Sequence, residues 1–401
     1  MLGIPLALCC LLPAILGLPL EDQYEIPEAY KALTPHDLAV KAGYQAESYE
    51  VVTEDGYILG LERITGSEKS PPAAGKPVVL LIHGLLDCSP SWVFPGPEKG
   101  FALMLSDWGY DVWMGNVRGN RYSRKHVNLT VSNPDYWLFS WHEMGVYDIP
   151  AMIDYALKIS KQEKLFLVSH SQGGSAFFVM ATERPEYQEK IIASFALAPA
   201  TFMNNSKNPL LNILAPHSSD IKFMLDLIGM SEFKPSKKLI QTLGKIVCDD
   251  QSFLQPVCKN IVFLIGGFND KDMNLTLLST VVQYDPAGAS TRQFVHYAQL
   301  MTSGKFRKYD HGLIGNMKKY GQIHPPDYDL AKVKLPVYIY YGSNDILVAP
   351  EDTRKLYEKL PNAQKFLVPY EYFTHLDFLW GKHVDIWVYN QVLSLMERYK
   401  K

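Results

Sequence analysis

Short, continuous apolar segments recur along the chain at the length of a β-strand. Residues 77–83 read PVVLLIH, and residues 165–169 read LFLVS. An uninterrupted apolar run of this length is typical of a strand that is buried on both faces, as in a parallel sheet covered by helices. We predict further strands of this kind at 111–116, 193–198, 337–342 and 365–368.

Helical patterns separate several of these runs. They cover residues 143–160 (with a disturbance at Pro150), 172–183 and 352–360, and the chain closes with an amphipathic segment at 383–399. A β-hairpin is expected around Glu54-Asp55-Gly56, which lies between two β-rich segments. Strands that alternate with helices indicate the α/β class, with a mostly parallel sheet covered on both faces.

This alternation stops between about residues 200 and 320. Apolar residues there recur at helical spacing instead; they include Leu210, Leu211, Ile213, Leu214, Phe223, Met224, Leu227 and Ile228. We therefore predict a mainly helical insertion over 200–320 that caps the sheet, inserted into a core formed by 19–199 and 321–401. The apolar stripes of the insertion either pack its helices together or line a substrate channel or lid, and both interpretations stay open.

Composition and charge exclude several other classes of protein. Of the 401 residues, 47% are hydrophobic, which is ample for a packed core and excludes a disordered chain. Thirty-nine Lys and Arg against forty-two Asp and Glu give a net charge of −3. No basic stripe with interleaved aromatics is present, so nucleic-acid binding is not expected. No CxxC or HExxH spacing occurs, so we expect no metal site.

Ser169-His170-Ser171-Gln172-Gly173 lies where the predicted strand at 165–169 meets the predicted helix at 172–183. A tight strand-to-helix turn of this kind holds one serine in a strained, exposed position as a nucleophile. The residues two before and two after that serine must be small, because strand and helix pass close to each other. Gly173 meets this requirement, and Ser169 replaces the usual glycine. We predict that Ser171 is the nucleophile.

A serine nucleophile needs a base, and the base needs a residue that orients it. Asp345 follows the predicted strand at 337–342, and His375 follows the one at 365–368. Serine, acid and histidine thus occur in the order that hydrolases with this turn use. We predict a triad of Ser171, Asp345 and His375. We expect structural roles for the remaining candidates, which are His170, His296, His324 and the pair Asp310-His311.

The tetrahedral intermediate of acyl transfer needs backbone N–H donors. The N–H of Gln172, directly after the nucleophile, is one natural donor. The second is expected in the loop after the early strand at 77–83, which reads His83-Gly84-Leu85-Leu86. Gly84 allows a tight turn there, and we predict that the N–H of Leu85 is the second donor.

The first twenty residues, MLGIPLALCCLLPAILGLPL, contain no charged side chain. About 20 apolar residues would suffice to cross a bilayer. Pro5 and Pro13 interrupt the segment, however, no Lys or Arg cluster flanks it, and Gly17 offers a cleavage position. We predict a signal peptide over residues 1–18, with a membrane anchor or a buried helix as alternatives, and no further membrane-spanning segment. The protein is then secreted or, alternatively, lysosomal, and the sequons at Asn128, Asn204 and Asn274 are expected glycosylation sites.

Export changes the interpretation of the five cysteines. Cys9 and Cys10 leave with the signal peptide. Cys248 and Cys258 are close in sequence and able to close a short loop in an oxidising compartment. Cys88 is then unpaired, and we expect it to be a buried free thiol.

Long motifs in a fixed order make the chain resemble the acid lipase family, which includes gastric lipase, lysosomal acid lipase and secreted insect relatives. The resemblance extends over residues 49–383. Besides the serine turn, it rests on His83-Gly84-Leu85-Leu86, the segments 116–126 (NVRGNRYSRKH) and 139–144 (FSWHEM), Tyr309-Asp310-His311-Gly312, Pro325-Pro326-Asp327-Tyr328, Gly342-Ser343-Asn344-Asp345 and the segment 375–381 (HLDFLWG). The chain departs from the family at Ser169 and at Tyr284-Asp285, where the family usually has glycine and His-Asn.

The resemblance implies an α/β-hydrolase fold with an inserted cap. It implies cleavage of ester bonds in neutral lipids, triacylglycerols or steryl esters, at a lipid–water interface, without cofactor, metal or obligatory protein partner. The family's triad falls on Ser171, Asp345 and His375. Its oxyanion donors fall on Leu85 and Gln172, and its cap disulfide falls on Cys248–Cys258.

Two other functions remain open at this point. One is an esterase for small soluble esters, whose activity would not rise above the solubility limit of its substrate. The other is a catalytically inactive lipid-binding protein built on a lipase fold. Such proteins typically lack a member of the triad, whereas this chain keeps all three.

Overall fold

One mixed sheet organises the part of the chain that the computed structural model describes, which is residues 33–227, 229–233, 269 and 271–400. Its strands follow the order β1-β2-β4-β3-β6-β7-β10-β11, with β5 beside β2. They are β1 (Gln45–Val52), β2 (Tyr57–Gly66), β3 (Val78–Ile82), β4 (Asp111–Gly115), β5 (Lys125–His126), β6 (Leu165–His170), β7 (Ile191–Leu197), β10 (Val337–Tyr341) and β11 (Ala363–Leu367).

All neighbouring strands from β4 to β11 run parallel, whereas β1, β2 and β5 pair in antiparallel fashion. The antiparallel pair β1–β2 is the hairpin expected around Glu54-Asp55-Gly56. The parallel strands β3, β4 and β6 are buried along their whole length, as their continuous apolar sequences predict. The prediction of a mostly parallel sheet is therefore confirmed.

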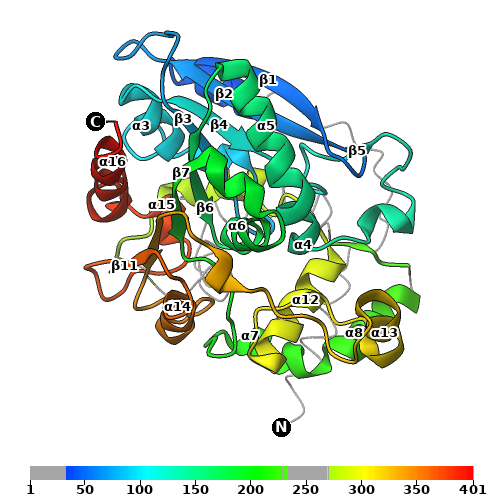
Figure 1. Ribbon diagram of the computed structural model, residues 1–401. Coiled ribbons are helices and arrows are strands. Elements are labelled where there is room, and N and C mark those ends of the chain that lie inside the picture. The colour runs from blue at the N-terminus through cyan, green and yellow to red at the C-terminus, as the bar shows by residue number, and fades with distance from the viewer. Residues whose placement is uncertain (1–32, 228, 234–268, 270, 401) are drawn as a thin grey trace.

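Successive residues of the central strands point to opposite faces of the sheet, and each face has its own hydrophobic core. Leu80 and Ile82 of β3 pack on the face covered by α5 (Ile149–Ser160) and α6 (Gln172–Glu183). Val79 and Leu81 pack on the other face, with α3 (Phe101–Asp107) and α16 (Asn390–Glu397). Figure 1 shows α5 and α6 in front of the strands. The alternation of side chains along a strand thus produces two cores from one apolar run.

The helices predicted for the core at 143–160, 172–183, 352–360 and 383–399 are present with small shifts, and further helices were not predicted. The segment predicted at 143–160 is divided into α4 (Trp141–Glu143), a π-helical turn (Met144–Asp148) and α5. Pro150 is the second residue of α5 and directly follows the π-helical turn, so the disturbance predicted at Pro150 lies at the change from π-helix to α-helix. The other helices are α2 (Pro35–Lys41), α14 (Pro350–Tyr357), α15 (Asp377–Trp380), a second π-helical turn (Asp385–Tyr389) and the 3₁₀ turns Ser89–Trp92, Pro134–Trp137, Pro185–Lys190 and Leu330–Lys332.

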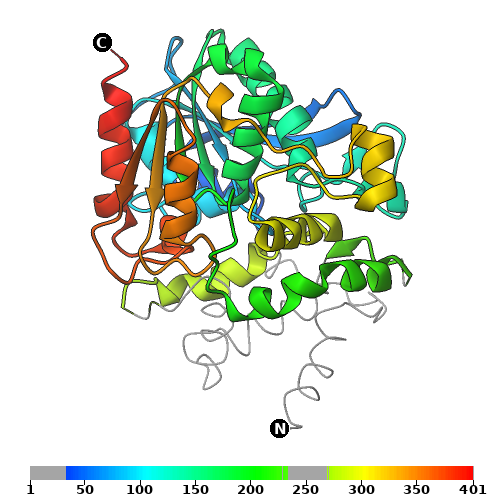
Figure 2. The same cartoon turned by 60° about the horizontal axis from the view of Figure 1, so that its bottom comes forward.

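The segment between β7 and β10 contains the elements of the predicted insertion. They are α7 (Pro209–Leu214), a 3₁₀ turn (Ala215–His217), α8 (Ser218–Leu227), β8 (Glu232–Phe233), a 3₁₀ turn (Leu275–Leu277), α11 (Leu278–Tyr284), β9 (Ala289–Ser290), α12 (Thr291–Ser303) and α13 (Gly312–Tyr320). In Figure 2 the green helices α7 and α8 and the yellow-green helices α11 and α12 lie below the sheet, at the edge to which the arrowheads point, and the golden-yellow α13 lies to the right. Most described helices of this segment therefore lie at the edge formed by the carboxyl ends of the parallel strands.

Two of the sequence predictions fall outside the described residues. They are the signal peptide at 1–18 and the cysteine pair Cys248 and Cys258. Among the residues that the structure describes, no helix combines the length and the apolar character needed to cross a membrane.

Candidate active site

The predicted nucleophile, acid and base all follow parallel strands. Ser171 follows β6, Asp345 lies four residues beyond β10, and His375 lies in the segment after β11. The carboxyl ends of parallel strands lie at one edge of the sheet. In open α/β sheets, ligands bind in the crevice outside that edge. The chain thus directs all three side chains to one edge, beneath the insertion.

Ser171 has a backbone conformation that few non-glycine residues adopt, with φ 52° and ψ −115°. Its N–H donates to the carbonyl oxygen of Leu197 at 2.9 Å, which fixes the turn against β7. A Cβ atom on Gly173 would lie 2.6 Å from the carbonyl oxygen of Ile82, so only glycine fits there. The strand and helix therefore pass as closely as a nucleophile turn requires, and Ser171 holds the strained conformation between them.

Asp345 and His375 form a buried hydrogen-bonded pair. Nδ1 of His375 lies 2.7 Å from Oδ2 of Asp345. Because a carboxylate can only accept, Nδ1 carries a proton, and in a neutral imidazole ring Nε2 then holds the free lone pair. The other carboxylate oxygen of Asp345 accepts the backbone N–H groups of Leu347 and Val348, at 2.9 and 2.8 Å. These two bonds fix the carboxylate, which in turn orients the imidazole.

His170 connects the serine turn to the segment that carries His375. Its Nε2–H donates to the carbonyl oxygen of His375 at 3.1 Å, and the two rings lie 4.9 Å apart. Burial, and then the neighbouring His375, lower the pKa of His170 well below its usual value, so the ring is neutral. His170 is thus a hydrogen-bonding residue, as expected. A Cβ atom on Gly84 would lie 3.2 Å from both His170 Nδ1 and Ser171 Cβ, so the loop after β3 also reaches this point.

The loop after β3 is held by His83. Nδ1–H of His83 donates to the carbonyl oxygen of Gly84 at 2.8 Å, and Nε2 accepts from Val117 N and Asn120 Nδ2 at 3.2 and 3.0 Å. Burial lowers the pKa of His83, which keeps the ring neutral and able to accept at Nε2. The segment 116–126, whose role the sequence left unassigned, therefore fixes the loop that carries Leu85.

The two candidate oxyanion donors belong to this loop and to the first turn of α6. Gln172 is the first residue of α6, and the first N–H groups of a helix have no partner within the helix. They also lie at the positive end of the helix dipole, which favours an anion. Leu85 is followed by Leu86, whose φ of 64° turns the loop sharply.

Two acidic side chains behind this loop were not recognised from the sequence. The hydroxyl of Ser91 donates to Asp87 and lies 3.4 Å from Oδ2 of Asp285. Burial raises the pKa of both carboxyl groups, and the Asp87 charge raises that of Asp285 further. Next to them, Ala287 N–H donates to Leu86 O at 2.6 Å, which joins the insertion to the loop. The sequence offered one indication of this acidic pair, which is that Asp285 stands where the family usually has asparagine.

A third acidic residue, Asp377, supports the segment that carries His375. Its Oδ2 accepts the N–H and the hydroxyl of Thr374 at 2.7 and 2.8 Å, and the amide of Asn269 at 2.7 Å. Its Oδ1 is buried without a hydrogen-bond partner, and so is Oδ2 of Asp272. Burial raises the pKa of Asp377 to about 6, with a further contribution from the Asp272 charge. The motif at 375–381 contained this residue but did not reveal its partners.

The other histidines of the sequence analysis lack the arrangement of a catalytic base. His296 is fully buried between the hydroxyl of Ser140 and the carbonyl of Arg307, at 2.9 and 3.0 Å. His311 faces Arg292, and burial together with that charge lowers its pKa to about 4. His324 is exposed.

The remaining predicted residues are a buried thiol and the three sequon residues. Cys88 is a free, buried thiol. The sequon residues Asn128 and Asn204 are exposed, and Asn274 is half-buried.

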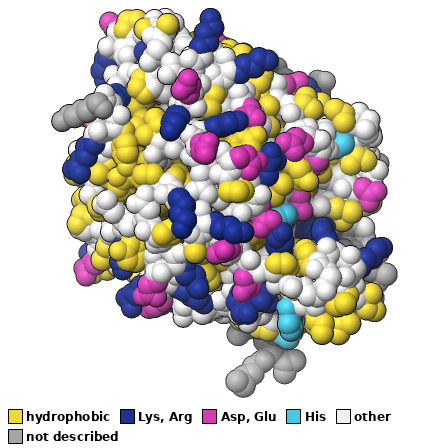
Figure 3. All heavy atoms as spheres, in the orientation of Figure 1, with side chains coloured by type: hydrophobic (Ala, Val, Ile, Leu, Met, Phe, Trp, Pro, Cys, Tyr) yellow, Lys and Arg dark blue, Asp and Glu magenta, His cyan; other side chains and the backbone are white. Residues whose placement is uncertain are grey.

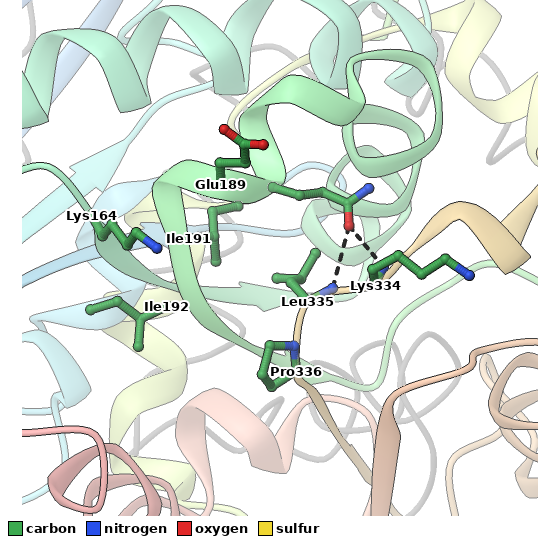
Figure 4. A pocket seen from close by; sticks show the side chains of 8 residues that line it. Lys164, Glu189, Ile191, Ile192, Lys334, Leu335 and Pro336 are labelled. Atoms are coloured by element: carbon green, nitrogen blue, oxygen red, sulfur yellow. Dashed lines mark hydrogen bonds between the residues drawn. The ribbon is translucent and has the colours of Figure 1, made fainter.

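A shallow hollow of about 400 Å³ lies elsewhere on the molecule (Figure 4). Its lining comes from residues at or just before the starts of β6, β7 and β10; among them are Lys164, Ile191 and Pro336. The side-chain oxygen of Gln188 accepts the N–H groups of Lys334 and Leu335 across it, at 2.8 and 3.3 Å. Because the starts of parallel strands lie at the edge opposite their carboxyl ends, this hollow is separate from the Ser171 site.

Comparison with known proteins identifies similar family models and relatives. Residues 35–96 match the family model of a partial α/β-hydrolase lipase region, and residues 77–216 match the model of the α/β hydrolase fold. Lipase 3 of Drosophila melanogaster is 45% identical over 359 residues, which cover 89% of this chain and 91% of that protein. Gastric triacylglycerol lipase of Mus musculus is 40% identical over 360 residues, covering 88% of this chain and 89% of that protein.

Solved structures support the fold. A soluble variant of monoglyceride lipase from Saccharomyces cerevisiae, in complex with a substrate analogue, superposes with a TM-score of 0.52 at 15% sequence identity. The alignment covers 95% of this chain and 98% of that one. At this identity the likeness is one of fold, and it agrees with the predicted α/β-hydrolase architecture.

The packing around Ser169 leads to a first prediction. Its side chain is fully buried, its hydroxyl has no hydrogen-bond partner, and a Cβ atom on Gly174 would lie 3.7 Å from that oxygen. Ser169→Gly should leave ester hydrolysis equal or faster, whereas Ser169→Val should impair folding or rate, because a branched side chain does not fit between β6 and α6. Ser169→Ala isolates the hydroxyl and should be neutral or stabilising by about 1 kcal/mol. Full activity of the valine variant would contradict this account of the turn.

Asp377 leads to a prediction about pH. Because its pKa is raised in the folded state to about 6, its stabilising contribution is present below about pH 4 and is lost as the pH rises through 6. Asp377→Asn keeps an oxygen for Thr374 and Asn269 but cannot ionise. The variant should therefore gain stability relative to the natural chain only above pH 4, reaching on the order of 3 kcal/mol at pH 7.5.

Thermal or urea unfolding at pH 4 and pH 7.5 measures this difference. Asp135→Asn, which removes an exposed carboxylate, is the matched control. A difference between Asp377→Asn and the natural chain that does not change with pH would refute the prediction.

Proposed function

This chain belongs to the α/β-hydrolase lipases and is a carboxylic ester hydrolase, and we propose that it hydrolyses neutral lipid esters through Ser171, Asp345 and His375. The observation that carries the proposal is the hydrogen bond of 2.7 Å between Asp345 and His375, at the same sheet edge as the strained Ser171.

In the proposed mechanism, Nε2 of His375 accepts the hydroxyl proton of Ser171 while Oγ attacks the ester carbonyl. Asp345 stabilises the imidazolium that forms. The N–H groups of Leu85 and Gln172 bind the oxyanion, and His375 then protonates the departing alcohol. Water, activated by His375, attacks the acyl-enzyme, and Ser171 regains its proton when the fatty acid leaves. No cofactor or metal takes part in these steps.

The substrate class is proposed from the relatives and from the domain organisation. Gastric triacylglycerol lipases of mouse and human are 40% and 36% identical to this chain over most of its length. We infer that triacylglycerols, with steryl esters as a second class, bind between a core of residues 19–199 and 321–401 and a cap of residues 200–320. An esterase for small soluble esters is the alternative.

The destination of the protein is a further part of the proposal. The apolar segment at the N-terminus, without charged residues before Glu21, supports export. Secretion is the destination we propose, with the lysosome as the alternative, and a lipid surface is the only partner required.

The triad predicts a specific kinetic pattern. Ser171→Ala and His375→Ala should each lower kcat by about 10⁵–10⁶, and Asp345→Ala by somewhat less, because the three residues act as a unit. The double variant Ser171→Ala/His375→Ala should be scarcely slower than either single variant. Initial rates on triolein emulsion and on a short nitrophenyl ester, at pH 5 and pH 8, measure these effects.

Two controls accompany this experiment. A fluorophosphonate should label Ser171 and no other serine. The natural chain should show a rise in rate above the solubility limit of a lipid substrate, whereas a constant rate would favour the soluble-ester alternative. Full triolein hydrolysis by folded Ser171→Ala would end the proposed mechanism.

Export predicts covalent processing. Protein collected from the medium of a eukaryotic culture should begin near Leu18 and contain a Cys248–Cys258 disulfide, with Cys88 free. It should carry glycan at some of the three sequons, which are Asn128, Asn204 and Asn274. N-terminal sequencing and peptide mapping, with and without glycosidase, check these points. A secreted chain that still begins at Met1, or a disulfide that contains Cys88, would disprove them.

A further inference from the structure

The helix α13 exposes large apolar side chains to solvent. The exposed fractions are 64% for Leu313, 81% for Ile314 and 48% for Met317. Met317 lies four residues after Leu313 and three after Ile314, so the three side chains share one face of the helix. Ile323, just beyond the helix, is 53% exposed. Figure 3 shows hydrophobic side chains gathered at the lower right, where Figure 1 places α13. We call these four residues the α13 apolar face.

The inward side of the same helix is polar. Asn316 is the buried residue of α13, and its amide donates to Oδ1 of Asp310 and to the carbonyl oxygen of Ile323, both at 2.8 Å. Its side-chain oxygen accepts the N–H of His311 at 2.9 Å. The helix is therefore attached by hydrogen bonds and directs its apolar side chains outward, the reverse of an ordinary surface helix.

This reversal indicates a function outside folding. An apolar side chain that stays in water contributes nothing to the hydrophobic core, and contiguous exposed apolar patches mark interaction sites. Two exposed lysines, Lys318 and Lys319, stand in the last turn of α13. Large aliphatic side chains next to lysines are typical of helices that lie in the interface of a lipid surface, where the lysines meet anionic groups.

Contacts connect α13 to the catalytic helix α6. Gln299 of α12 exchanges two hydrogen bonds of 2.9 Å with the backbone of Asp310, next to α13. The guanidinium of Arg292, also on α12, lies 4.2 Å from the ring of Tyr309. At the other side of α12, the hydroxyl of Tyr297 lies 2.8 Å from that of Ser175 in α6. A surface bound by α13 would thus be held in a fixed orientation to the Ser171 turn.

We propose that the α13 apolar face, with Lys318 and Lys319, is the surface by which this protein adsorbs to a lipid–water interface. The proposal rests on the proposed lipase function, since a lipid surface is the occupant only if the substrates are lipids. The α13 apolar face is then the part of the molecule that contacts the lipid surface. The proposal also assigns separate contributions to the aliphatic side chains and to the lysines.

The test compares Leu313→Ser/Ile314→Ser with the natural full-length chain. Partition onto sedimented vesicles of phosphatidylcholine with one-fifth phosphatidylserine should fall on the order of 100-fold, about tenfold for each aliphatic side chain that leaves the interface. The rate on triolein emulsion should fall in parallel. Hydrolysis of dissolved nitrophenyl butyrate should be unchanged, because α13 is not part of the catalytic machinery.

Matched variants separate the contributions. Val52→Ser/Ile386→Ser removes two side chains of similar exposure, 57% and 59%, from other elements and should keep natural partition. Lys318→Gln/Lys319→Gln should weaken binding to the anionic vesicles and leave binding to pure phosphatidylcholine nearly unchanged. The same vesicle sedimentation, repeated with Ser171→Ala in each variant, measures adsorption in the absence of hydrolysis. It therefore distinguishes a failure of the proposed catalysis from a failure of the proposed adsorption.

Two results would overturn the proposal. One is unchanged vesicle partition of Leu313→Ser/Ile314→Ser. The other is a natural chain that sediments as a dimer in analytical ultracentrifugation and becomes monomeric in that variant while keeping its partition, because a second copy of the chain would then be the occupant of the α13 apolar face.

Discussion

The close passage of β6 and α6 at Ser171 is the constraint on which the rest of the structure depends. Gly173 packs against the backbone of β3, and Ser171 takes a left-handed conformation in the turn between strand and helix. A residue in such a conformation persists only when its surroundings determine it. The hydrogen bond to Leu197 and the fully buried strands β3 and β6 provide these surroundings. The hydrophobic cores on the two faces of the sheet therefore stabilise the sheet and also hold Ser171 in its strained conformation.

Neutral, buried histidines extend this rigidity to the rest of the site. His83 fixes the loop after β3, and His170 binds the backbone of His375. Burial lowers the pKa of both rings, so each keeps one donor and one acceptor nitrogen over the neutral range. Asp377 performs a related task by holding Thr374, but burial raises its pKa to about 6. The supports of the site therefore have different sensitivities to pH: the histidines remain neutral, whereas the carboxyl group ionises.

The insertion joins the catalytic edge and the proposed lipid-binding surface. Ala287 binds the backbone of Leu86 in the loop after β3, and Tyr297 meets Ser175 of α6. On its outer side the same segment carries α13, whose buried residue is Asn316. Leu300 and Phe306 pack the insertion against the core, whereas α13 itself is held by the hydrogen bonds of Asn316 and directs its aliphatic side chains outward. The helix α12 would in this way connect the proposed adsorption surface on α13 to the helix α6 that follows Ser171.

The sequence by itself determined most strands of the sheet and the identities of the candidate residues, because both depend on local patterns. Continuous apolar runs specify buried strands, and the turn at Ser171 requires small residues at fixed positions. The tertiary structure alone decided which distant groups meet. Asp285 contacts Ser91, and Asn269 donates to Asp377. The members of each pair are more than a hundred residues apart, so no periodic pattern in the sequence indicates the contact. The outward direction of the α13 apolar face was likewise hidden, because apolar residues at helical spacing predict burial unless the polar partners of Asn316 are known.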